Sequence, residues 1–382
     1  MSVAHDSTRD VPSPGGLDRD IAPITSVRAR AFSIPTDAPE ADGTFEWHAT
    51  TLIVVEIDAG GCTGLGYTYT DACAAALIAQ TLAPELLHRD AACIRALTQR
   101  LWRRVRNIGR AGVAATAISA LDCALWDLQA RLVGLPLVRL LGGPAREAVP
   151  IYGSGGFTSY SDAQLTEQFE RWVNENGCRA VKMKVGSDPA RDPERVACAR
   201  AAIGDTALFV DANGALSVKS ALDCAHRFAQ YGVTWFEEPV SSDDLAGLRA
   251  VRRAAPPPMD IAAGEYAYTP DDFRRMLEAQ AVDVIQADAS RCGGISGFLQ
   301  AAALSNAWHI PLSAHCAPAL HLHVAAAAPG LRHVEWFHDH VRIEAMLFDG
   351  APVAHDGAIR PDLSRPGCGL EFKHRDAQRF AV

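Results

Sequence analysis

Three carboxylate side chains stand at the ends of three successive apolar segments of this chain. They are Asp211 after LFV, Glu237 after TWF and Glu265 after IAAG, at intervals of 26 and 28 residues. Such intervals are close to one strand-plus-helix unit of a parallel barrel. Oxygen atoms brought together at strand ends repel one another unless a hard divalent cation offsets them, and oxygen-only ligation favours Mg²⁺. The sequence therefore predicts a magnesium site; the alternative is three acids that separately cap the following helices.

Two lysines interrupt the apolar run that precedes Asp211. Lys182 and Lys184 alternate with Val181, Met183 and Val185. Residues two apart in a strand share a face, so both ammonium groups are expected to point into the barrel. Like charges held together lower each other's pKa, which predicts a lysine that acts as a base near neutral pH. The alternative is an edge strand with solvated lysines, which the apolar neighbours disfavour.

Three further polar residues follow later strand candidates. Asp288 ends the run DVIQA, His315 ends IPLSA, and Glu335 ends a candidate eighth strand. A carboxylate and an imidazole on neighbouring strand ends form a pair that fixes the histidine tautomer and raises its basicity. The alternative for His315 is a hydrogen-bonded core histidine. Because successive strand residues face opposite ways, Glu238 and Cys316 are expected to point away from the barrel axis.

The chain resembles the enolase superfamily, mandelate racemase subgroup, in eight motifs that occur in order. The motifs are Ala120–Asp127 (ALDCALWD), Lys182-Met183-Lys184, Asp211-Ala212-Asn213, Trp235–Pro239 (WFEEP), Gly264-Glu265, Asp288 followed by Gly293-Gly294, His315 and Glu335. The resemblance extends from about Ile24 to the C-terminus. It implies an α/β fold, a modified (β/α)7β TIM-type barrel with an α+β N-terminal capping domain.

The resemblance also implies roles for individual residues. Mg²⁺ would be held by the three acids Asp211, Glu237 and Glu265. Lys184 and the His315–Asp288 pair would be bases on opposite faces of the substrate. Lys182 and a protonated Glu335 would bind the substrate carboxylate, and Asn213 is a further substrate-binding candidate.

Cap residues bear on the substrate. In the resembled family the first cap loop closes over the substrate, and here that loop contains Trp47 and His48, with Tyr69 in a neighbouring segment. These hydrogen-bonding groups favour a polyhydroxylated acid over an aryl acid. We therefore expect Mg²⁺-dependent abstraction of the proton next to a carboxylate through an enediolate. The expected outcome is dehydration of a hexonate or hexarate to a 2-keto-3-deoxy acid.

Two alternatives stay open. The same enediolate serves a racemase, an epimerase or a lactone cycloisomerase. A different class is a barrel that binds a sugar acid without catalysis, and proton exchange in D₂O distinguishes it from an enzyme.

The composition argues against several other classes of protein. The 382 residues are 48% hydrophobic and 21% charged, and the net charge of −9 argues against broad nucleic-acid binding. No apolar run approaches a membrane span, and residues 1–23 lack the apolar core of a signal peptide. The ten cysteines are dispersed and are expected to be reduced. We expect a cytoplasmic homo-oligomer whose partner is a small-molecule carboxylic acid.

Four segments follow along the chain. Residues 1–23 are predicted to be a flexible tail, 24–145 the capping domain, 146–340 the barrel, and 341–382 a loop-rich segment that packs back on the cap. In the cap, strands are expected at 24–33, 50–58 and 64–70, with a polar loop over 35–47 and helices from 71 to 141. Barrel strands are expected at 149–153, 179–185, 207–211, 233–237, 260–264, 283–287, 310–314 and 333–335.

Overall fold

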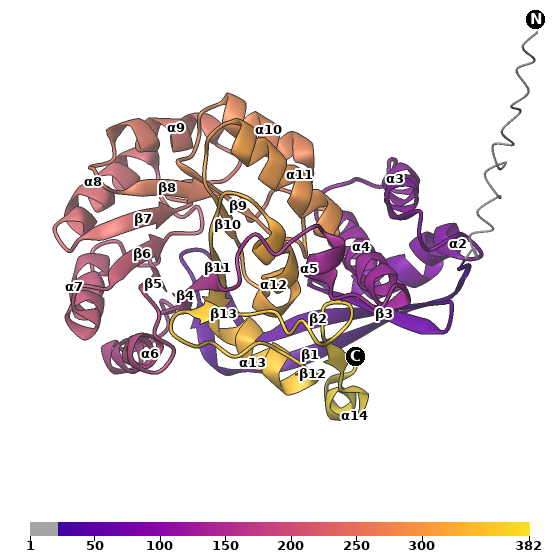
Figure 1. The fold of residues 1–382 in the computed structure, drawn as a ribbon. Helices are drawn as coiled ribbons and strands as arrows, with labels where there is room; N and C mark the ends of the chain where they lie inside the picture. The colour runs from indigo at the N-terminus through magenta and orange to yellow at the C-terminus, as the bar shows by residue number, and fades with distance from the viewer. Residues whose placement is uncertain (1–21) are drawn as a thin grey trace, which may run out of the picture.

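The computed structural model describes residues 22–382, and residues 1–21 of the predicted tail lie outside the described part. Figure 1 shows an antiparallel sheet with its helices on one side of the molecule and a parallel barrel on the other. No helix within residues 22–382 combines the length and the apolar character needed to cross a membrane.

The cap sheet contains three antiparallel strands in the order β1-β2-β3. They are β1 (Ile24–Ala41), β2 (Glu46–Ala59) and β3 (Cys62–Tyr69). The predicted loop over 35–47 is wrong, because β1 continues to Ala41 and pairs Glu40 with Trp47 across a tight turn. The register is irregular between Pro35 and Glu40. This end of the hairpin carries several charged residues and lacks an apolar alternation, so its strand character was hidden.

Helices cover the cap sheet. They are α1 (Cys73–Leu77), a π-helical turn (Ile78–Leu82), α2 (Ala83–Leu86), α3 (Ile94–Arg104), α4 (Val113–Leu132) and α5 (Leu137–Leu140). The long helix α4 lies against β3 at two glycines. A Cβ atom added to Gly66 would lie 2.1 Å from the carbonyl oxygen of Ala120, and one on Gly64 would lie 2.3 Å from that of Ala124. The strand and the helix can approach this closely only because these positions lack side chains.

Two buried acids of α4 tie the cap to the rest of the molecule. Asp122 accepts hydrogen bonds from the Thr98 hydroxyl at 2.8 Å and from the Ser296 backbone N–H at 2.9 Å. Asp127 accepts from the backbone N–H groups of Leu65 and Cys368. The acids of the ALDCALWD motif therefore join the cap, the barrel and the C-terminal segment, and their role is structural.

Eight parallel strands close the barrel through pairing of β11 with β4. The strands are β4 (Val149–Gly155), β5 (Ala180–Lys184), β6 (Ala207–Asp211), β7 (Val233–Glu237), β8 (Asp260–Ala263), β9 (Val284–Ala287), β10 (Leu312–Ala314) and β11 (Leu331–Phe337). The helices between them are α6 (Asp162–Asn174), α7 (Asp192–Ile203), α8 (Val218–Ala229), α9 (Leu245–Ala254), α10 (Pro270–Glu278), α11 (Gly294–Ala307) and α12 (Pro318–Ala327). Seven strand–helix units and a final strand confirm the predicted barrel.

The inside of the barrel is layered. An apolar cluster fills its lower part with Tyr152, Ala180, Phe209, Trp235, Ala262 and Val284. Polar residues two positions further along the same strands, such as Lys182 after Ala180 and Asp211 after Phe209, share the inward face. The apolar layer therefore supports the charged residues from below and excludes water there.

The C-terminal segment packs on the cap. Arg131 of α4 forms an ion pair with Glu371 at 2.6 Å, and the Phe372 ring lies 5.3 Å from that of Phe32. The segment contains β12 (Phe348–Asp349), β13 (Ala358–Ile359), β14 (Glu371–Phe372), α14 (His374–Ala377) and a 3₁₀ turn (Gln378–Phe380). The loop-rich expectation missed helix α13 (His338–Leu347), which directly follows β11. Its histidines and charged residues obscured the helical pattern.

Candidate active site

The three strand-end carboxylates converge inside the barrel. Asp211 and Glu237 end β6 and β7 and are directly paired in the sheet. Glu265 follows Gly264, where φ is +138° and a Cβ atom would lie 2.1 Å from the Gln286 carbonyl oxygen. One oxygen from each acid lies within 4.8 Å of the others, and all three residues are buried. This geometry suits a shared cation.

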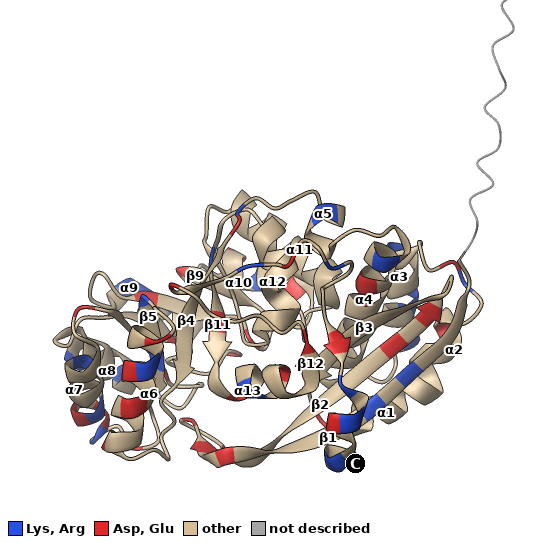
Figure 2. Cartoon of the chain, turned by 60° about the horizontal axis from the view of Figure 1, so that its bottom comes forward, with Lys and Arg blue, Asp and Glu red and all other residues tan. Residues whose placement is uncertain are grey.

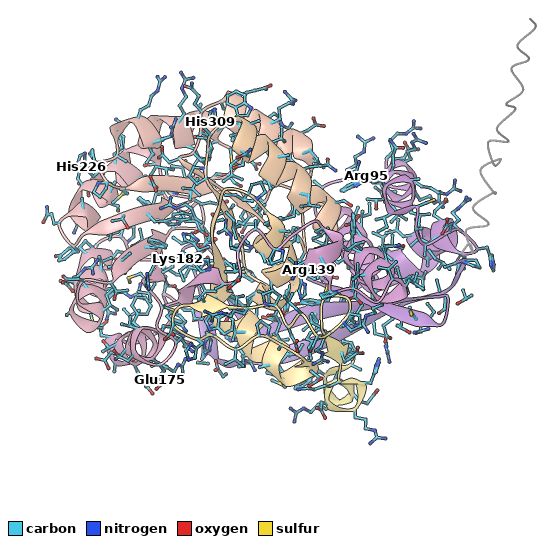
Figure 3. All side chains as sticks on the ribbon, in the orientation of Figure 1. Arg95, Arg139, Glu175, Lys182, His226 and His309 are labelled. Atoms are coloured by element: carbon cyan, nitrogen blue, oxygen red, sulfur yellow. The ribbon has the colours of Figure 1, made fainter. Side chains whose placement is uncertain are left out.

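Both predicted lysines point into this cluster, and Figure 3 shows Lys182 inside the barrel. The Lys182 Nζ lies 2.6 Å from Glu237 and 2.8 Å from Glu335, and the Lys184 Nζ lies 2.6 Å from Asp211. The expectation of lowered lysine pKa values is wrong for this arrangement. Although burial opposes the charged form, the neighbouring carboxylates raise the pKa of both ammonium groups above its usual value.

The charges of the cluster do not balance. Burial and the neighbouring Asp211 raise the pKa of Glu237 to about 8, whereas the Lys184 ammonium overcomes burial and lowers the pKa of Asp211. The Oε2 atom of Glu265 is buried without a hydrogen-bond partner. With all four acids ionised, as a bound cation would favour, the carboxylates of Asp211, Glu237, Glu265 and Glu335 face two lysines. A divalent cation offsets the surplus of two, so the trio fits Mg²⁺.

His315 and Asp288 form the predicted pair. The His315 Nδ1 lies 2.8 Å from the Asp288 Oδ2, and its Nε2 lies 3.5 Å from Glu265. Although burial opposes protonation, Glu265 and Glu335 raise the pKa of His315, with help from Asp288. His315 directly follows β10 and Lys184 ends β5, and these two strands are separated in the barrel by β11 and β4. The two groups therefore face the trio from different sides.

Glu335 is fully engaged at the end of the barrel. Its Oε1 accepts from the Ser154 hydroxyl at 2.5 Å, and its Oε2 accepts from the Cys316 backbone N–H at 3.0 Å. Burial raises its pKa, but the ammonium of Lys182 outweighs burial and holds the pKa well below its usual value. The expected protonated Glu335 is therefore wrong for this arrangement, and its carboxylate binds Lys182.

Of the two side chains expected to face away from the barrel axis, Cys316 takes part in the site. The Cys316 Sγ lies 3.3 Å from the His315 Nε2 and 3.4 Å from Glu335. Glu238 is buried, and burial with the neighbouring Glu265 raises its pKa well above the usual value. Both residues have positive φ, +51° at Cys316 and +36° at Glu238, and both lie beyond the last residue of their strands, Ala314 and Glu237. The alternation rule fails where the strand stops.

A cavity of about 570 Å³ opens above the barrel strand ends. The barrel supplies Lys184, Asn213, Glu265, Tyr266, Arg291, His315, Cys316, Glu335, Phe337 and His340. The cap supplies Asp42, Phe45, Trp47, Ala49, Thr50, Thr51, Tyr69, Thr70 and Asp71. The cavity is therefore shared between the two parts of the molecule, with the charged groups at its base.

Some of the predicted substrate-binding residues line this cavity, and others do not. Asn213, Trp47 and Tyr69 line the cavity, and the Asn213 Oδ1 and the Tyr69 hydroxyl are buried without hydrogen-bond partners. Glu335 lines it too, but Lys182 and His48 do not: Lys182 is fully buried, and the His48 side chain is 73% exposed and lies 3.6 Å from Glu46. In the β2 strand His48 faces away from the cavity side that its neighbour Trp47 occupies.

Arg291 and His340 are among the lining residues that the sequence did not predict. Arg291 donates to the Glu265 carbonyl oxygen at 3.1 Å and lies 3.5 Å from the Asp288 carboxylate. His340 stacks on Tyr69 with ring centroids 3.5 Å apart. Arg291 stands three residues after a strand-end acid, a spacing that places both at one helix entrance. His340 lies in α13, so only recognition of that helix would have placed it.

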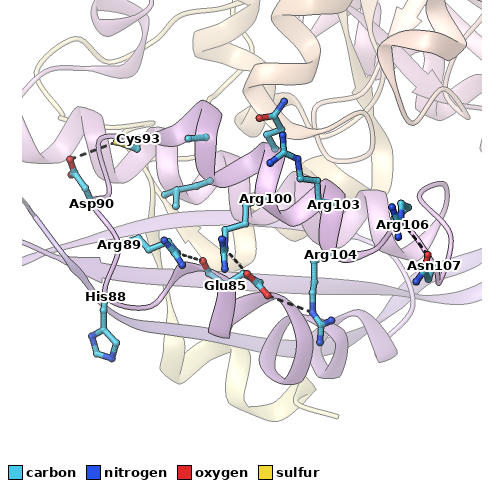
Figure 4. Close-up of a pocket in the computed structure, with 13 residues that line it drawn as sticks. Glu85, His88, Arg89, Asp90, Cys93, Arg100, Arg103, Arg104, Arg106 and Asn107 are labelled. Carbon is cyan, nitrogen blue, oxygen red and sulfur yellow. Dashed lines mark hydrogen bonds and ion pairs between the residues drawn. The ribbon is translucent and has the colours of Figure 1, made fainter.

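A second cavity, of about 710 Å³, lies on the cap (Figure 4). It is lined mainly by arginines of α3 and by Glu85, which forms an ion pair with Arg100 at 2.5 Å. None of the acid trio and neither lysine lines it, whereas Glu265 and Lys184 line the cavity at the barrel mouth. The cavity at the barrel mouth, although smaller, is therefore the candidate active site.

Comparison with known proteins agrees with this geometry. Residues 28–142 match the mandelate racemase / muconate lactonizing enzyme N-terminal domain, and residues 164–377 match the enolase C-terminal domain-like family. A 3,6-anhydro-alpha-L-galactonate cycloisomerase of Streptomyces coelicolor is 35% identical, over 94% of this chain and 99% of its own.

Two solved structures are also similar. A mandelate racemase/muconate lactonizing enzyme-like protein from Rubrobacter xylanophilus has 47% identity and a TM-score of 0.92, covering 94% of this chain and 100% of its own. The L-talarate/galactarate dehydratase of Salmonella typhimurium, liganded with Mg and L-lyxarohydroxamate, has 27% identity and a TM-score of 0.85. That match covers 100% of this chain and 96% of the dehydratase.

Fold and site together define a capped barrel enzyme whose strand ends gather three acids between a lysine and a histidine–aspartate pair. The chain belongs to the enolase superfamily, in the mandelate racemase and muconate lactonizing enzyme subgroup.

Proposed function

We propose that this protein is a Mg²⁺-dependent enzyme that removes the proton next to the carboxylate of a sugar acid and then expels the oxygen substituent at C3. The observation that carries the proposal is the placement of Lys184 and His315 on different sides of the acid trio. A carboxylate trio alone supports only cation binding. Two proton-transfer groups beside it support reaction at a carbon acid.

Asp211, Glu237 and Glu265 are the residues proposed to hold the ion. The Salmonella dehydratase liganded with Mg supports this choice. When bound, Mg²⁺ supplies positive charge that offsets the negative charge developing on the substrate carboxylate. Lys182, held by Glu237 and Glu335, adds a fixed ammonium group beneath the same position. A charge fixed before the reaction needs no reorganisation during it.

Lys184 is proposed to take the α-proton. Its pKa is raised in the protein because its ammonium group donates a hydrogen bond to the Asp211 carboxylate at 2.6 Å, and that negative charge favours the protonated form. Lys184 therefore becomes a base only when the Asp211 charge is engaged elsewhere. This links proton abstraction to occupation of the trio, and an enzyme without its metal is expected to be inactive.

His315 is proposed to protonate the leaving oxygen. Its Nδ1 is directed to Asp288, and its Nε2 lies beside Glu265 and Cys316, which line the cavity together with His315. A raised pKa keeps a larger fraction of the imidazole protonated near neutral pH, as a general acid requires. In the reaction, the C2–H and C3–O bonds break, a C2–C3 double bond forms, and the enol then takes a proton at C3 to give a 2-keto-3-deoxy acid.

Two leaving groups fit this chemistry. A hydroxyl at C3 leaves as water, which makes the enzyme a dehydratase like the Salmonella relative. A ring oxygen bridging C3 and C6 stays attached at C6, so the product is an isomer. The Streptomyces cycloisomerase, which matches almost the whole chain, favours this second candidate. Both leaving groups imply the same residues.

The cavity lining supports a polyhydroxylated substrate. The Asn213 Oδ1 and the Tyr69 hydroxyl are buried without partners, and Thr50, Thr51 and Thr70 add further hydroxyl groups. Buried polar atoms without partners are rare in native proteins, so a bound ligand is expected to supply the missing hydrogen bonds. Substrate hydroxyls would do so, whereas an aryl group would not.

A substrate screen tests the proposal. The purified protein with Mg²⁺ is incubated with aldonates, aldarates and 3,6-anhydro aldonates, and keto acids are trapped with semicarbazide. The proposal expects a 2-keto-3-deoxy acid from at least one class, and the responding class identifies the leaving group. A change of configuration or isomerisation of a lactone without any keto acid would overturn the elimination in favour of an epimerase or lactone cycloisomerase.

A further inference from the structure

A second cluster of metal-binding side chains lies outside the barrel mouth. Asp37 and Glu40 come from β1 of the cap, and His338 is the first residue of α13. One possible ligand atom from each lies within 4.8 Å of the others. The His338 Nε2 is 3.0 Å from the Asp37 Oδ2 and 3.1 Å from its Oδ1. The cluster therefore joins the cap and the barrel with an imidazole and two carboxylates.

Glu40 is the unusual member of this cluster, because a carboxylate with no solvent exposure lies at the hairpin edge. Its Oε2 accepts from the Trp47 indole N–H at 2.9 Å, but its Oε1 has no hydrogen-bond partner. Burial and the neighbouring Asp339 raise the pKa of Glu40 to about 9. Asp339 pairs with Arg342 through Oδ1, and its Oδ2 is also buried without a partner.

Two explanations are available for the open oxygen of Glu40. A protonated Glu40 removes the charge of this group but gives no role to Asp37 and His338, whose possible ligand atoms lie within 4.8 Å of it. A cation bound by Glu40, Asp37 and His338 satisfies the open oxygen and offsets the acidic surroundings. Only a bound cation explains both the open oxygen of Glu40 and the gathering of Asp37 and His338 beside it.

We propose that Asp37, Glu40 and His338 form a second cation site, distinct from the acid trio of the barrel. An imidazole among the ligands favours a transition metal of the zinc or manganese class over Mg²⁺, which prefers oxygen atoms. Asp37 is the entry side of the site, with 46% of its side chain exposed. Water would complete the coordination.

The position of the site gives it a consequence for the active-site cavity. Figure 2 shows acidic residues at the end of the β1–β2 hairpin beneath the barrel. Trp47, which Glu40 holds, lines the candidate active site and packs edge-on against Phe157 at 5.6 Å. A cation bridging β1 to α13 would therefore fix the cap hairpin and one wall of the cavity. This inference does not depend on the reaction catalysed.

Zinc binding provides the test. Wild type and variants are dialysed against excess Mg²⁺, which occupies the barrel trio, and then against micromolar Zn²⁺; bound zinc is counted by elemental analysis. Asp37→Asn and His338→Ala are the test variants. His355→Ala is the matched control, because His355 is an exposed histidine 3.0 Å from Asp356 in a different segment. Thermal unfolding is measured with and without Zn²⁺.

We expect wild type and His355→Ala to bind about one more zinc ion per chain than Asp37→Asn or His338→Ala. Zinc should raise Tm by roughly 2 °C or more in the first two proteins only, because a ligand that binds the folded state stabilises it. Equal zinc content in all four proteins would overturn the proposal and leave a protonated Glu40. If His338→Ala fails to fold, the half-exposed Asp37→Asn decides alone. Zinc could also bind at His315, Cys316 and Glu335 in the barrel. That zinc would be present in all four proteins, so it cancels in the comparison of their zinc contents.

Discussion

The barrel strand ends and the cap surface line the same cavity but are built differently. At the strand ends, Lys182 and Lys184 are each held by carboxylates at 2.6 Å, on strands whose register fixes them. On the cap, the Tyr69 hydroxyl has no partner and Phe45 is 67% exposed. The barrel therefore arranges charge before substrate arrives, whereas the cap offers groups that a ligand must complete. Chemistry is expected to depend on the first region and substrate selection on the second.

The largest expected effect comes from the acid trio. Asp211→Asn or Glu237→Gln should lower kcat/KM by about 10³-fold or more, because each removes a charged cation ligand at the reacting centre. Removal of metal with EDTA should abolish turnover, and Mg²⁺ should restore it. Activity is measured by keto acid formation. Asp223→Asn, at an acid with 70% side-chain exposure, is the control and should match wild type. Full activity in either variant would show that the acid trio does not hold a catalytic cation.

The two proton-transfer groups should give the next largest effect. Lys184→Ala and His315→Asn should each lower kcat by about 10²–10⁴-fold, with fold and Mg²⁺ binding retained. If Lys184 is the base and His315 the acid, only His315→Asn should still exchange the α-proton in D₂O, read by NMR. Asp288→Asn should behave as a weaker His315 variant. Loss of all exchange in both variants would indicate one concerted unit.

A cap variant should give a smaller effect of a different kind. Trp47→Phe keeps a ring against Phe157 but removes the indole N–H that binds Glu40. Loss of one hydrogen bond to a buried acid should raise KM by about 3- to 10-fold and change kcat less. Trp308→Phe, at a residue 45% exposed and absent from the cavity lining, is the matched control. A fall in kcat alone would contradict the division between cap and barrel.

The smallest expected effect concerns stability. The pKa of Glu40 is raised to about 9 in the folded protein, above its ordinary value of 4.5. The folded state therefore binds this proton more tightly than the unfolded state, and stability is lost as pH rises between these two values. Gln at position 40 does not titrate, so only wild type loses this contribution. In EDTA, the Tm of Glu40→Gln minus the Tm of wild type should therefore increase from pH 5 to pH 8. Parallel Tm curves for the two proteins would contradict the raised pKa.

The fold and the reacting groups were predictable because strand periodicity and strand-end acids are local patterns. Asp211, Glu237 and His315 each end an apolar run, and parallel strand ends must meet at one face. Cys316 was misplaced because it lies beyond the end of β10, where its positive φ overrides alternation. The ionisation of Lys184 and Glu335 was misjudged because it depends on partners brought from other strands. His48 and His340 required knowledge of the cap hairpin and of α13.

The proposal that this protein removes the proton next to the carboxylate of a sugar acid is tested directly by following the loss of that proton. The panel of sugar acids is incubated in D₂O with Mg²⁺ and either wild type or the double variant Lys184→Ala/His315→Asn, and the C2 proton signal is followed by NMR. Wild type should remove this proton from at least one acid, and the double variant should not. Ligand-observed NMR shows in parallel whether wild type binds any of these acids. If it binds a sugar acid but no acid in the panel loses its C2 proton, the protein is a binding barrel and the proposed proton abstraction is wrong.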